Sequence, residues 1–127
     1  MGESASPPCD GLGTRPLKIL LDNCVPRPFE RLFQNHEIIH CSRLGWGKLG
    51  NGRLLSAAED AGFPVMVTVD RSMEFQQNMG GRSIAVIYLR ALSNDLETLK
   101  PMVEMVLAAV ENLQPGTIHT IQHPDWP

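Results

Sequence analysis

The sequence predicts an α/β fold, a three-layer sandwich with a mainly parallel central sheet in the strand order 2-1-3-4. Short segments that are apolar almost throughout recur at residues 17–21, 64–69 and 83–89. Such runs are typical of strands buried on both faces of a parallel sheet. Helical or turn-forming segments separate them, and this alternation indicates βαβ units. Because the crossovers are right-handed, a reversal of winding after the second strand places the first and third strands side by side.

The first half of the chain supplies two strands and two helices. We expect a strand, a helix, a second strand, a glycine-rich loop and a second helix over residues 17–21, 26–33, 36–41, 42–52 and 52–61. Pro26 suits the first turn of a helix, where no backbone donor is needed. Asn51 is the expected N-cap of the second helix. Gly62 is expected to end that helix in a left-handed conformation.

The second half ends in a long helix and an edge strand. We expect a strand, one or two helical turns, a strand, a long helix and a final strand over residues 64–69, 71–78, 83–89, 94–113 and 117–122. Asn94 and Glu97 have the spacing of a capping box at the start of the long helix. Pro101 lies inside the helical pattern, so we expect a kink or a restart there.

Length and composition indicate one soluble globular domain. The chain has 127 residues, of which 43% are hydrophobic and 20% charged, values usual for such domains. We expect a disordered leader over residues 1–16, a single domain over 17–122 and a loose tail over 123–127. No apolar run is long enough to cross a bilayer. The three cysteines form no CxxC pair, which favours a reducing, cytoplasmic setting.

Charge is distributed unevenly along the chain. The net charge is −3, but residues 15–90 contain ten Lys and Arg against seven Asp and Glu, a net charge of +3. The remainder contains one against seven, a net charge of −6. The overall balance argues against strong sequence-independent binding of nucleic acid. The positive charge of residues 15–90 is compatible with a modest basic face around the part of the chain that contains Asp22 and Asp70.

Two aspartates follow buried strands and form the main functional signal. Asp22 comes directly after the first strand and Asp70 after the third. In an open parallel sheet, ligands bind outside the carboxyl ends of the strands, where the strand order reverses. The strand order predicted above brings both carboxylates to that position. The alternative is that each aspartate only caps the helix that follows it.

Four segments resemble a known family. They read LKILLDNCVPRPFERL, LGWGKLGNGRLLSAAEDAG, VMVTVDRSMEFQQN and IAVIYLRA, and with them the resemblance extends from about Leu17 to Gly116. They are similar to the compact PIN-like proteins of bacteria, among them toxin-type proteins. PIN domains are typically Mg²⁺- or Mn²⁺-dependent ribonucleases with acidic residues at the carboxyl edge of the sheet. The resemblance implies a PIN-like fold, RNA as substrate and an antitoxin protein as partner; homo-oligomer formation stays open.

The resemblance assigns Asp22 and Asp70 to the family's acids after strands one and three. They are the expected catalytic residues and the ligands of one weakly bound Mg²⁺ or Mn²⁺ ion, with Asn23 and Glu74 as further ligands. Such an ion can activate a water and neutralise charge on a phosphodiester. Substrate contacts are expected from four further residues, Asn51, Arg71, Arg90 and Trp46.

The sequence departs from the family pattern at two positions. Members commonly have Asp-Glu after the first strand, where this chain has Asp22-Asn23, and an acid near the start of the second helix, where it has Asn51. Asparagine can coordinate through its carbonyl oxygen but adds no charge. Two functions therefore stay open. The first is a metal-dependent ribonuclease, which could be the toxin of a toxin-antitoxin pair. The second is a catalytically weakened PIN-like binding or regulatory protein.

Overall fold

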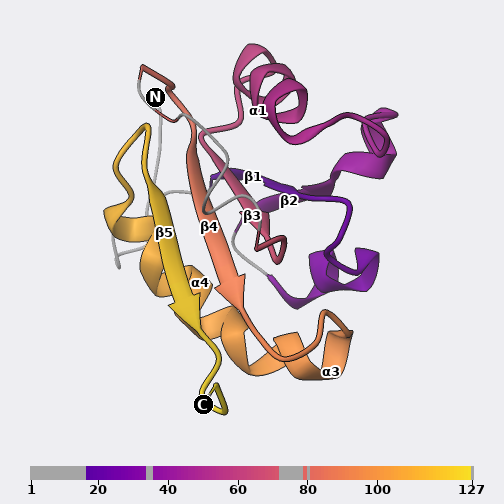
Figure 1. Ribbon diagram of the computed structural model, residues 1–127, viewed down its shortest axis with the longest axis vertical. Helices are drawn as coiled ribbons and strands as arrows, with labels where there is room; N and C mark the ends of the chain where they lie inside the picture. Colours follow the sequence, from indigo (N-terminus) through magenta and orange to yellow (C-terminus); the bar gives the residue numbers. More distant parts are fainter. Residues whose placement is uncertain (1–16, 34–35, 72–78, 80, 127) are drawn as a thin grey trace, which may run out of the picture.

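Five parallel strands form one sheet in the order β2-β1-β3-β4-β5 (Figure 1). The structure is a computed structural model that describes residues 17–33, 36–71, 79 and 81–126. The strands are β1 (Lys18–Leu21), β2 (Glu37–His40), β3 (Val65–Thr68), β4 (Ala85–Arg90) and β5 (Ile118–Gln122). The predicted order 2-1-3-4 is confirmed, and β5 extends it as a parallel edge strand beside β4.

Helix α1 (Asn51–Asp60) covers one face of the sheet. Leu54 and Leu55 on this helix are at most 1% exposed and pack with Leu20 of β1 and Met66 of β3. These helix positions lie on its apolar stripe, which faces the sheet. The chain then reverses at Gly62, whose φ of 86° is the left-handed conformation expected there.

A series of short helices covers the opposite face. They are the 3₁₀ helices η2 (Arg27–Leu32), η4 (Lys100–Met102) and η5 (Val110–Asn112), and the α-helices α3 (Leu96–Leu99) and α4 (Val103–Ala109). Phe29 of η2 and Val106 of α4 are fully buried and belong to the same apolar cluster as Leu21 of β1. The sheet therefore lies between two helical layers, as in an α/β fold.

Several local predictions need correction. The first helix is the 3₁₀ helix η2 rather than an α-helix; its first residues are bracketed by Pro26 and Pro28, which lack N–H donors. The long helix is interrupted by η4 at Pro101, so the predicted break is confirmed. The helical turns expected over residues 71–78 lie outside the described residues after Arg71.

Both predicted N-caps are wrong. Gly50, not Asn51, occupies the N-cap of α1. Asp95, not Asn94, caps α3, and its carboxylate accepts a hydrogen bond from Thr98 N at 3.1 Å. The two asparagine side chains instead reach across to the carboxyl ends of β1 and β3.

Within the part of the chain that the structure describes, no helix combines the length and the apolar character that a membrane crossing requires.

Candidate functional site

The candidate site lies where β1 and β3 end next to each other. Ile19, Leu20 and Leu21 of β1 pair in register with Val65, Met66 and Val67 of β3. From these ends the chain leaves in opposite directions, since β1 leads to β2 on one side and β3 leads to β4 on the other. Such a reversal opens a crevice at the carboxyl edge of a parallel sheet. Asp22 follows β1 directly, and Asp70 comes two residues after β3.

The carboxylate of Asp22 is buried and held by neutral donors. Asp22 as a whole residue is 6% exposed. Oδ1 accepts the backbone N–H of Asn23 at 2.7 Å, and Oδ2 accepts the hydroxyl of Thr68 at 2.7 Å. The backbone N–H of Asp22 donates to Val67 O at 2.9 Å, which fixes its Cα beside β3. The carboxylate is therefore fixed in orientation before any ligand arrives.

Thr68 links the two aspartates. Its hydroxyl donates to Asp22 Oδ2 and accepts the backbone N–H of Asp70 at 3.0 Å. Thr68 is fully buried at the end of β3, so its bond to Asp22 is shielded from water, and its bond from Asp70 N–H is partly buried. One hydroxyl thus ties the Asp22 side chain to the Asp70 main chain, and the two residues lie side by side as predicted.

Asp22 has no cationic partner among the residues that the structure describes. Each of its side-chain hydrogen bonds comes from a neutral group: Asn23 N–H, Thr68 O–H and the thiol of Cys24. A buried carboxylate without a counter-charge is unfavourable unless a cation or further donors compensate for lost hydration.

The donor set fits a hard divalent cation. Carboxylate oxygens are available from Asp22 and Asp70, and Mg²⁺ usually takes one or two carboxylates and keeps several waters. Each carboxylate oxygen can accept more than one contact, so Asp22 retains coordination capacity. Among the described residues, no group of three or more His, Cys, Asp or Glu side chains forms a ready-made metal cluster. The site can therefore offer one ion two carboxylates and leaves its remaining positions to water or substrate.

Cys24 supports Asp22 rather than acting as a nucleophile. Its Sγ lies 3.8 Å from Asp22 Oδ2 and 3.4 Å from Thr68 Oγ1. Burial, and then the nearby charge of Asp22, raise the pKa of the Cys24 thiol. The thiol consequently stays protonated at neutral pH and can donate to the carboxylate, whereas nucleophilic cysteines need the thiolate form.

Asn23 and Asn51, which stand where the PIN-like pattern has acids, border the two aspartates. Asn51 Nδ2 lies 3.4 Å from Asp70 Oδ2, so the first residue of α1 points at the site instead of capping its own helix. Asn23 is exposed, and a Cβ added to Gly47 would lie 3.4 Å from Asn23 Oδ1. The loop between η3 (Cys41–Leu44) and α1 therefore passes close to Asn23.

The other predicted site residues are dispersed. Arg90 lies at the end of β4, where it donates to Gln122 at 3.1 Å and lies over the rings of Tyr88 and Trp126. Trp46 packs edge-on against Phe63, with ring centroids 6.2 Å apart, and joins the core on the α1 side. Arg71 is exposed directly after Asp70, and Glu74 lies outside the described residues.

Three residues at this edge were not expected to take part. Thr68 bridges the aspartates, Asn94 Nδ2 donates to Cys24 O at 2.9 Å, and His40 Nε2 donates to Val25 O at 2.7 Å. Thr68 could have been found in the sequence, because its hydroxyl interrupts an apolar strand two residues before Asp70. The other two act across long sequence separations, which one sequence does not show.

Sequence and geometry thus place the buried Asp22 carboxylate, which is bonded to the Thr68 hydroxyl, beside the partly buried Asp70 at the switch point of a parallel sheet. Comparison of the chain with profiles of known protein families, with curated proteins and with solved structures gave no match.

Proposed function

We propose that this protein is a ribonuclease of the PIN-like type that uses one Mg²⁺ or Mn²⁺ ion held by Asp22 and Asp70. The observation that carries the proposal is the buried Asp22 carboxylate, which has only neutral donors and lies beside a second aspartate. A bound ion would supply a water of lowered pKa and would neutralise charge on the phosphodiester. The fold class and the edge at which the site lies agree with this function.

The residues of the chain divide the remaining work. Thr68 holds Asp22 Oδ2, and the Asn23 N–H holds Oδ1, so the carboxylate keeps its orientation while substrate binds. Asn51 faces Asp70. Its amide group has both a donor and an acceptor, so it can contact either the carboxylate or a bound substrate. Preorganised ligands of this kind lower the reorganisation needed in the transition state.

Exposed cations in the segments that follow β1 and β2 support a polyanionic substrate. Four exposed basic residues have no hydrogen bond or ion pair with any described residue: Arg27, Arg31, Lys48 and Arg53. Arg27 begins η2, which follows β1, and Arg31 lies near the end of η2; Lys48 and Arg53 lie in the loop before α1 and in the first turn of α1, which follow β2. By contrast, Arg43, Arg82 and Lys100 are paired with glutamates. Free cations are suited to phosphate contacts.

The second candidate is a PIN-like binding or regulatory protein without catalysis. Asn51 favours it, because an amide N–H points at Asp70 where the PIN-like pattern has another carboxylate. A site with fewer acids attracts a divalent cation less strongly. The two candidates differ in whether an aspartate variant loses an RNA-cleaving activity.

Asp70→Asn decides between them. We expect wild-type protein to cleave a mixed RNA pool with added Mn²⁺, and the variant to cleave it at least about tenfold more slowly because the ion loses a carboxylate. Single-turnover cleavage and Mn²⁺ titration by electron paramagnetic resonance measure the effect. Asp60→Asn is the matched control, since Asp60 is exposed at the far end of α1. Equal cleavage by all three proteins would assign the activity to a contaminant and favour the binding protein.

Arg27→Gln combined with Arg53→Gln is expected to weaken RNA binding without changing Mn²⁺ affinity. Each lost phosphate contact makes the negative slope of log affinity against log salt less steep by about 0.7 for a single strand. The slope of the double variant should therefore be less steep by about 1.4. Fluorescence anisotropy with a labelled RNA at several salt concentrations measures the slope. Lys100→Gln is the control, because Lys100 is exposed but paired with Glu97 at 3.2 Å. If the slope is unchanged, Arg27 and Arg53 do not contact the RNA, and the RNA binds to another face of the protein.

A further inference from the structure

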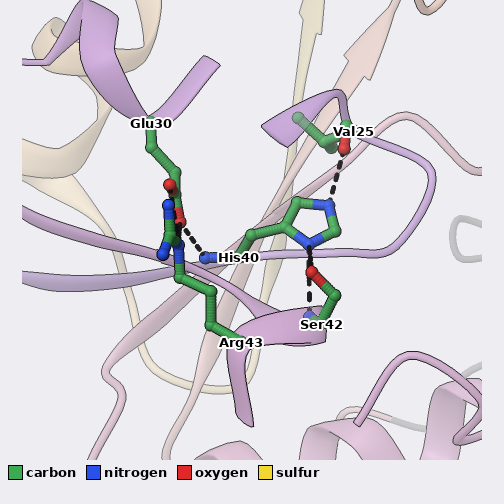
Figure 2. A network of polar contacts seen from close by, with 5 residues as sticks. All are labelled: Val25, Glu30, His40, Ser42 and Arg43. Carbon is green, nitrogen blue, oxygen red and sulfur yellow. Dashed lines mark hydrogen bonds and ion pairs between the residues drawn. The ribbon is translucent and has the colours of Figure 1, made fainter. Parts of the chain in front are cut away.

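His40 lies behind the turn that carries Asp22. It is the last residue of β2, pairs in register with Leu21 and is 2% exposed. Figure 2 shows its ring between Val25 on one side and Ser42 on the other. Nε2 lies 2.7 Å from Val25 O, and Nδ1 lies 2.8 Å from Ser42 Oγ and 3.2 Å from Ser42 N. A buried imidazole with both nitrogens engaged is held in one orientation.

The partners of the ring assign its tautomer. The carbonyl of Val25 can only accept, so Nε2 carries the proton. The backbone N–H of Ser42 can only donate, so Nδ1 is the acceptor. The ring is therefore the neutral Nε2–H form, and it connects the start of η3 to the turn after β1.

That turn is the one on which the aspartate site depends. The backbone N–H of Val25 donates to Asp22 O at 3.0 Å and closes the turn, within which Asn23 N–H donates to Asp22 Oδ1. His40 holds the turn at the carbonyl of Val25, and Asn94 holds it at the carbonyl of Cys24. The orientation of the Asp22 carboxylate is thus linked to a side chain on a different strand.

A second set of contacts fixes the main chain of His40. Its backbone N–H donates to Glu30 Oε2 at 2.7 Å, and Arg43 donates to both oxygens of Glu30 at 2.9 and 2.8 Å (Figure 2). Burial by itself raises the pKa of Glu30, but the hydrogen bonds from Arg43 and from His40 N–H outweigh it and hold that pKa below its ordinary value. The carboxylate therefore remains charged and keeps the end of β2 in place.

We propose that His40 is a positioning residue for Asp22, acting through the hydrogen bond from Nε2 to the carbonyl of Val25. The inference deepens the proposed ribonuclease function and rests on it for its catalytic consequence. Its structural part, that the Nε2 bond keeps the Asp22–Val25 turn closed, does not depend on that function. Outer partners that orient metal ligands commonly change metal affinity by about tenfold to a hundredfold when they are replaced.

Two substitutions separate the two nitrogens of the ring. In His40→Gln the terminal amide N–H₂ takes the place of Nε2 and can still donate to Val25 O. In His40→Asn the amide oxygen takes the place of Nδ1 and can still accept from Ser42 N–H, but nothing reaches Val25. We expect His40→Asn to speed amide exchange at Asn23 and Val25 by about fivefold to tenfold and to weaken Mn²⁺ binding by about tenfold. We expect His40→Gln to stay within about threefold of wild type in both.

Hydrogen exchange, Mn²⁺ titration and thermal melting are measured on the same preparations. Faster turn exchange and weaker Mn²⁺ binding in His40→Asn, at a melting temperature equal to that of His40→Gln, support the proposal. Equal behaviour of the two variants, or greater damage in His40→Gln, would overturn it. Absence of Mn²⁺ binding in wild type would remove the ribonuclease function, while the exchange data would still decide the role of the ring. Nitrogen-15 shifts of wild-type His40 give a test without substitution: protonated Nδ1 would contradict the assignment.

Discussion

Asp22→Asn is expected to abolish Mn²⁺-dependent RNA cleavage, with a loss of about a hundredfold or more, while the protein stays folded. Asp22 is the more buried of the two aspartates, and its side-chain hydrogen bonds with the described residues come only from neutral groups. Removing its charge takes away the strongest attraction that the site has for a divalent cation. The effect on catalysis should therefore exceed that of Asp70→Asn.

The fold should tolerate this change because the local hydrogen bonds can be rebuilt. The new Oδ1 can accept from Asn23 N–H, and the new Nδ2 can donate to Thr68 Oγ1. The Thr68 hydroxyl can then turn to Cys24 Sγ, which lies 3.4 Å away. Only the weak contact from the Cys24 thiol is lost and one amide N–H is left without an assigned acceptor, so we expect the free energy of unfolding to change by about 1–2 kcal/mol.

Metal-dependent stabilisation gives a readout that does not need RNA. Wild-type protein should gain about 2.7 kcal/mol of stability at a Mn²⁺ concentration one hundred times the dissociation constant. Asp22→Asn should gain none at the same concentration. Asp60→Asn is again the control and should behave as wild type. If Asp22→Asn is stabilised as much as wild type and cleaves RNA as fast, the metal site lies elsewhere and the ribonuclease proposal is wrong.

The sheet could be predicted because burial on two faces leaves a simple signal. Residues 18–21, 65–68 and 85–89 are nearly all apolar, and the structure buries almost every one of them. The reversal of winding after the second strand then places β1 beside β3. The position of the two aspartates follows from this topology alone, without knowledge of any side-chain contact.

Capping was predicted less well, because several residues compete for the same role. Asn94 and Asp95 can both cap a helix, and the choice depends on a tertiary contact, the bond from Asn94 Nδ2 to Cys24 O. Asn51 is likewise drawn away from α1 by Asp70. In both cases, a polar side chain next to the site contacts the site rather than its own helix.

The contacts of the supporting residues could not be predicted, even where the residue left a signal as Thr68 did, because their partners lie far along the chain. His40 and Val25 are 15 positions apart, and Thr68 and Asp22 are 46 apart. The residue type of His40, at the end of a short strand, does not by itself indicate this role. Only the fold shows that its ring stands behind the turn of Asp22.

Thr68→Val is expected to destabilise the protein by about 3 kcal/mol and to slow RNA cleavage by about tenfold or more. Valine has nearly the same shape, so packing in the fully buried end of β3 is kept. The lost hydroxyl leaves Asp22 Oδ2 with only the weak thiol contact at 3.8 Å and leaves Asp70 N–H without its acceptor. Buried polar groups without partners cost about 1–3 kcal/mol each, and more when charged.

Thr68→Ser separates the hydroxyl from the methyl group. Serine keeps both hydrogen bonds and loses one buried methyl, so its cost should be about 1 kcal/mol and its cleavage rate should remain close to that of wild type. Urea unfolding and single-turnover cleavage of both variants measure the difference. The two substitutions remove different groups from the same side chain. If stability and cleavage rate fall more in Thr68→Val than in Thr68→Ser, the effect is due to the hydroxyl that links Asp22 and Asp70. Equal losses would mean that the methyl packing, and not the hydroxyl between Asp22 and Asp70, holds this edge of the sheet together.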